Sequence, residues 1–168
     1  MTNGKDIVYT IREEDKEVVM ENKKKLRRSN LIFGIVFVIM ALVAFFGEIF
    51  SFTAYIDTLE GTESLEGFGI IVIIIFGLIA AIALLVCAIL NFVAAGVLSS
   101  NKNSGRGMAI VGAIFKFIAA CILILYCVLM FTYPMGYALK VLYVLVAVAS
   151  IYFGILDLTA SGKLKDSE

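Results

Sequence analysis

Three side chains within the long apolar runs of this sequence are able to carry chemistry: Lys116, Asp157 and Asn91. Ionisable and amide side chains are costly inside a bilayer, so they usually face protein or water and pair with one another. A lysine with a carboxylate and an amide can form a structural ion pair, a site for an ion, proton or ligand, or a contact with a partner chain. The residue types alone leave these three interpretations open.

Helical spacing places each of these residues on a stripe of small residues. The small residues recur at intervals of three, four or seven positions, which share one helix face. Small residues mark the faces at which membrane helices approach closely. We therefore expect the stripes to point inward, with Ile, Leu, Val and Phe toward lipid. The stripe residues are Gly34, Ala41, Gly77, Ala81, Ala88, Ala95, Ala113, Ala120, Ala147, Ser150 and Gly154.

Depth in the membrane predicts which polar residues meet. At about 1.5 Å per helical residue, Lys116 lies about 12 Å and Asn91 about 10 Å inside the nearer boundary, and Asp157 only a few Å. The lysine stem extends toward that boundary and so toward Asp157. The sequence thus predicts an ion pair between Lys116 and Asp157, with Asn91 close by. Glu48, about 27 Å from the same boundary, is expected outside this cluster as an outer-leaflet acid among the headgroups.

The elements that must position these residues are membrane-spanning helices. The chain is 61% apolar and 17% charged, whereas soluble domains are about 45–50% apolar and about 25% charged. Apolar runs long enough to cross a bilayer are predicted at residues 31–53, 69–98, 108–133 and 137–158. Runs of this length exclude a β-barrel, whose strands alternate over about ten residues. The expected fold is all-α, an integral membrane four-helix antiparallel bundle over residues 31–158.

Charged segments flank the predicted bundle. Residues 1–30 are expected to form a charged cytoplasmic tail, partly helical, with a β-prone or irregular stretch at 6–11, and residues 159–168 a second cytoplasmic tail. Basic residues gather before the first run, after the second and after the fourth, while the loop after the first is acidic. The positive-inside rule therefore predicts that the N and C termini are both cytoplasmic. Small size and simple loops favour a bacterial cytoplasmic membrane.

Composition excludes several classes of function. The sequence has no histidine, so it cannot build a His-ligated haem or a Ser-His-Asp triad. Cys87, Cys121 and Cys127 form no Cys-x-x-Cys pair, so no zinc ribbon or dithiol motif is present. No metal or other cofactor and no enzymatic activity are expected, since no nucleophile–base pair is evident. The formal net charge of +0 argues against nucleic-acid binding.

Two functional hypotheses remain. The first is a small multi-pass membrane protein that acts through protein–protein or protein–lipid contacts, as an accessory subunit, an assembly or immunity factor, or a scaffold. The alternative is a small oligomeric transporter or channel subunit in which Lys116, Asp157 and Asn91 line a cavity. The expected partners are the lipid bilayer and either another membrane protein or further copies of this chain. Water distinguishes the two, because a scaffold has a dry interior and a transporter needs a cavity that reaches these side chains.

Overall fold

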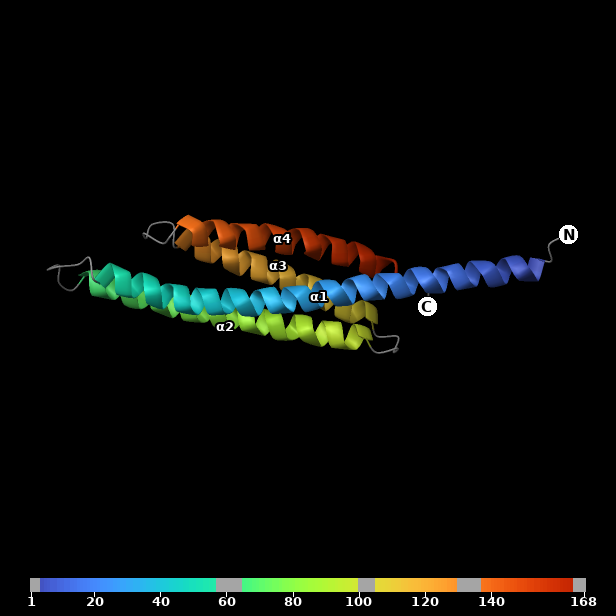
Figure 1. Ribbon diagram of the computed structural model, residues 1–168, viewed down its shortest axis with the longest axis horizontal. Helices are drawn as coiled ribbons and strands as arrows, with labels where there is room; N and C mark the ends of the chain where they lie inside the picture. The colour runs from blue at the N-terminus through green and yellow to red at the C-terminus, as the bar shows by residue number, and fades with distance from the viewer. Residues whose placement is uncertain (1–3, 57–64, 100–104, 130–136, 165–168) are drawn as a thin grey trace.

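The computed structural model is an all-α bundle of four long helices (Figure 1). It describes residues 4–56, 65–99, 105–129 and 137–164. All four helices are long and apolar enough to cross a membrane, so the predicted class of four-helix bundle with candidate membrane spans is confirmed. The helices are α1 (Gly4–Ile56), α2 (Leu65–Ser99), α3 (Gly105–Leu129) and α4 (Tyr137–Gly162).

The helices form two antiparallel hairpins that pack together. Most interhelical contacts join α1 to α2 and α3 to α4, and α2 also packs against α3. In Figure 1 the chain direction alternates from each helix to the next, and α1 extends well beyond the other three at its N-terminal end. The end of α2, the start of α3 and the end of α4 lie at this same end of the bundle. We call it the basic end, because the basic residues of the segment 23–28 lie there.

Helix α1 runs without a break from the charged N-terminal segment into the first candidate span. The expectation of a β-prone or irregular stretch at residues 6–11 is wrong, since these residues are helical. The reason lies in the sequence around them, because no proline or glycine interrupts residues 5–33 and local β-propensity is weak against a continuing helix. On the exposed face, Lys25 pairs with Glu21 at 2.8 Å, one helical turn away.

The apolar core lies between the helices, and the lipid-facing surface is made of large apolar side chains. The residues of the predicted small-residue stripes are all buried, so helix backbones approach closely along them. Phe50, Leu125 and Leu145 are 73%, 60% and 61% exposed, as side chains that face lipid rather than protein are. The largest core members are Phe33, Phe37, Met40, Leu84, Leu123, Tyr126 and Tyr143.

A second, smaller apolar cluster closes the basic end. It consists of Leu26, Leu98, Ala109 and Leu164, one from each helix or its end. Helix α4 continues to Gly162, one turn beyond residue 158, where the predicted span ends. The backbone N–H of Leu164 donates to the carbonyl of Ser161 at 3.2 Å, and this turn brings Leu164 back into the cluster.

Candidate functional site

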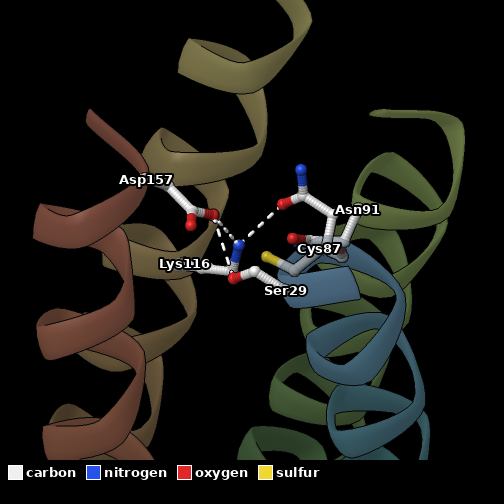
Figure 2. A network of polar contacts seen from close by, with 6 residues as sticks. Ser29, Cys87, Asn91, Lys116 and Asp157 are labelled. Carbon is white, nitrogen blue, oxygen red and sulfur yellow. Dashed lines mark hydrogen bonds and ion pairs between the residues drawn. The ribbon is translucent and has the colours of Figure 1, made fainter. Parts of the chain in front are cut away.

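Lys116 of α3 lies at the centre of a polar network inside the bundle (Figure 2). Its side chain is 0% exposed. The ammonium pairs with Asp157 Oδ2 of α4 and donates a hydrogen bond to Asn30 Oδ1 of α1 at 2.6 Å. Ser29 Oγ of α1 donates to the same carboxylate oxygen at 3.1 Å. We call these four residues the polar clamp, because they tie α1, α3 and α4 together.

Aromatic rings cover the apolar side of the clamp. The Lys116 ammonium lies 5.2 Å from the centre of the Phe33 ring, within the range of a cation–π contact. Phe33 in turn packs against Phe153 of α4, with ring centres 5.3 Å apart. The ion pair is therefore enclosed by rings from α1 and α4 as well as by polar partners. Asp157 is only 4% exposed.

A glycine in α3 provides the space for the Asn30 carboxamide. A Cβ atom at Gly112 would lie 2.9 Å from Asn30 Cγ and even closer to its oxygen. Asn30 is 0% exposed, and its Nδ2 has no hydrogen-bond partner among the described residues. The absence of a side chain at Gly112 thus lets α1 approach α3 closely enough for Asn30 to reach Lys116.

The structure brings Lys116 and Asp157 together as the sequence predicts, but Asn30 rather than Asn91 completes the contact. Asn91 is buried, and its Nδ2 donates to the carbonyl of Cys87 within α2 at 2.8 Å. Its Oδ1 has no hydrogen-bond partner in the described part of the chain. Figure 2 shows Asn91 and Cys87 beside the network, and the dashed line from Lys116 to a carboxamide oxygen is the hydrogen bond to Asn30.

Sequence analysis missed Ser29 and Asn30 because both were counted with the charged tail. One signal was available, since Asn30 stands four residues before Gly34 on the stripe that continues to Ala41. Extending this stripe by one turn places the carboxamide of Asn30 on the inward face. No equivalent signal identified Ser29, which is only partly buried.

The other residues singled out in the sequence take no part in the contacts of the clamp or fall outside the described side chains. Glu48 falls within α1, but its side chain is not among those the structure describes. Cys87 is buried, Cys121 is exposed and Cys127 is partly buried, and all three are free thiols. Over the described residues, no group of three or more His, Cys, Asp or Glu side chains is arranged to hold a metal ion.

The clamp provides an electrostatic crosslink between three helices. A lysine left unpaired at the centre of a span costs about 2.5–3.5 kcal/mol on the insertion scale, so a partner from the same chain stabilises the bundle. The lone pairs of one carboxylate oxygen are shared between Lys116 and Ser29. Such an arrangement fixes the register of α1 and α4 against α3, because a shift of either helix by one residue would break its contact.

No protein family, curated protein or solved structure matches this chain.

Proposed function

We propose that this chain is a non-enzymatic multi-pass membrane protein that acts by contacting other proteins or lipids in the bilayer, as an accessory subunit, an assembly or immunity factor, or a scaffold. The distribution of basic residues supports a placement with both termini in the cytoplasm. The small size and simple loops favour a bacterial cytoplasmic membrane. The observation that carries the proposal is the enclosure of the polar clamp, in which Lys116 is 0% exposed.

Enclosure favours a contact role because a transport site needs water or substrate at its charged groups. Here the ammonium of Lys116 is surrounded by Asp157, Asn30 and the Phe33 ring, all from the same chain. Its charge is used to hold helices together. The surface that remains for function is therefore the outer one, which consists of apolar side chains toward lipid and basic side chains at one end.

One observation favours the alternative, a small oligomeric transporter or channel subunit. Asp157 borders a groove between α1 and α4, and a groove that admits water could lead ions or protons to the carboxylate. A transport path would also need water on the far side of the clamp from this groove, so the two functions differ in whether water reaches the side of α2. Asn91 and Cys87 border the clamp on the side of α2, so the native Cys87 thiol is a natural probe for water there.

Thiol labelling in native membranes tests the proposal. A variant with Cys121→Ala and Cys127→Ala retains Cys87 as the single cysteine. N-ethylmaleimide crosses bilayers but reacts with a thiol only where water allows the thiolate to form. We expect no labelling of Cys87 in the membrane and full labelling after denaturation in dodecyl sulfate. The positive control carries Ser99→Cys in a background with all native cysteines replaced, because Ser99 is exposed at the end of α2.

Labelling of Cys87 at a rate within about tenfold of the Ser99→Cys control would overturn the proposal, because it requires water beside the clamp. The transporter alternative would then take its place, and ion flux into liposomes would be compared between this chain and its Lys116→Met variant.

A further inference from the structure

A groove of about 450 Å³ lies between α1 and α4 at the basic end. These two helices come from different hairpins and make few contacts with each other, which leaves their boundary open on the outer surface. The groove's apolar wall includes Ile32 of α1 with Phe153 and Leu156 of α4. These three side chains are 55%, 39% and 43% exposed, so the wall is open to the surrounding lipid.

The polarity of the groove changes along its length. Its basic residues Lys25, Arg28 and Lys163 lie toward the basic end, beyond the apolar wall. At about 1.5 Å per residue, Lys25 lies about 10 Å from Ile32 along α1, and Lys163 about 15 Å from Phe153 along α4. One end of the groove is therefore positively charged and the other is apolar. The boundary between the two lies where the apolar spans end and the charged segments begin.

The basic side chains at the edge of the groove, which we call the rim, are available to bind an anion. Arg28 and Lys163 are exposed and have no acidic partner among the described residues, whereas Lys25 is paired with Glu21. Asp157, the one acid among the described residues that line the groove, is neutralised by Lys116. It also lies six residues before Lys163, which is about 9 Å along α4. Over the described part of the chain, the rim thus presents two positive charges without an acidic partner, one on α1 and one just beyond the end of α4.

We infer that this groove binds an anionic phospholipid, with its phosphate between Arg28 and Lys163 and an acyl chain along Ile32, Phe153 and Leu156. Basic clefts between membrane helices bind anionic headgroups at the bilayer surface through this combination of charges. The apolar wall favours a lipid over a free phosphate, because an inorganic anion would use the rim and leave the wall without a role. This inference deepens the proposed function, since lipids are one of its two classes of partner.

Native mass spectrometry with two lipids of matched acyl chains tests the inference. The full-length protein is purified in mild detergent and titrated with dioleoyl phosphatidylglycerol or dioleoyl phosphatidylcholine. We expect one molecule of phosphatidylglycerol to be retained, and phosphatidylcholine to be retained much more weakly. The variant Arg28→Gln/Lys163→Gln should lose affinity for phosphatidylglycerol by roughly 10- to 30-fold, the expected effect of two surface charges.

The matched control is Lys24→Gln/Arg27→Gln, which removes the same amount of charge at the basic end but from α1 side chains outside the groove. It should bind phosphatidylglycerol as the unaltered chain does. Equal losses in the two double variants, or equal retention of the two lipids, would overturn the inference. Displacement of the lipid by millimolar glycerol 3-phosphate would also overturn it, because a soluble phosphate would then suffice. None of these results affects the labelling of Cys87, so the two proposals fail separately.

Discussion

The two halves of the bundle are held together by different interactions. Toward the basic end, the polar clamp joins α1, α3 and α4 through Lys116, Asp157 and Asn30. Toward the other end, which we call the apolar half, the described interior contains buried apolar side chains such as Leu84 and Leu123, at 0% and 1% exposure. The half toward the basic end combines a few directional contacts with its small apolar cluster, whereas the described interior of the other half relies on close packing.

This difference indicates which contacts fix the register of the helices in a membrane bundle. Lipid tails are as apolar as leucine, so burying an apolar side chain between helices gains only packing and no release of water. The apolar half thus tolerates small shifts in register at little cost in free energy. The clamp does not, because a displaced helix would leave Lys116 without its carboxylate. We therefore expect substitutions in the clamp to have the larger effects.

The largest effect is expected from Asp157→Asn, which leaves the Lys116 ammonium without its ion-pair partner. We expect the loss of one member of this buried pair to lower the free energy of unfolding by about 3 kcal/mol. Denaturation in mixed detergent micelles measures this change. Adding Lys116→Met to this variant should recover most of the loss, because it removes the buried charge. A double variant no more stable than the single one would show that the two residues are not coupled.

A smaller effect is expected from Leu84→Ala in the apolar half. The side chain is buried. In a membrane its truncation removes packing contacts only, because the alternative surroundings are lipid tails and not water. We expect a decrease of about 1–2 kcal/mol in the free energy of unfolding, below the values typical of soluble cores. The control is Leu85→Ala, whose side chain is 41% exposed toward lipid. If Leu84→Ala cost as much as Asp157→Asn, the proposed contrast between the halves would be wrong.

The smallest effect is expected from Gly112→Ala, which sharpens the comparison by disturbing the clamp without removing a charge. The new Cβ would collide with the Asn30 carboxamide and displace it from Lys116. We expect a loss of about 1 kcal/mol in the same unfolding measurement. Gly107→Ala is the matched control in the same helix, because a Cβ there meets no atom within 4 Å. Equal changes in the two variants would mean that Asn30 contributes nothing.

Sequence reasoning reached the fold and part of the clamp for identifiable physical reasons. Apolar runs of membrane length have few structural alternatives, so the helices could be predicted. The pairing of Lys116 with Asp157 followed from helical spacing and depth, because both are fixed by the geometry of a helix. Asn30 was missed because it lies just before the first apolar run. The start of an apolar run reflects composition only, and a helix can pack against its neighbours beyond it. Choosing between Asn30 and Asn91 required knowing which helices touch α3 closely, and this is a tertiary property.

The location of the ion pair has a consequence for how the chain enters its membrane. Lys116 and Asp157 both belong to the second hairpin, formed by α3 and α4. The two buried charges of the clamp are therefore matched within this hairpin before the rest of the bundle assembles. The first hairpin brings only the uncharged polar groups of Ser29 and Asn30 to the clamp, so its docking adds no further charge to this site. In a two-stage assembly, where each hairpin inserts before the two associate, the Lys116 ammonium would thus have its carboxylate at both stages.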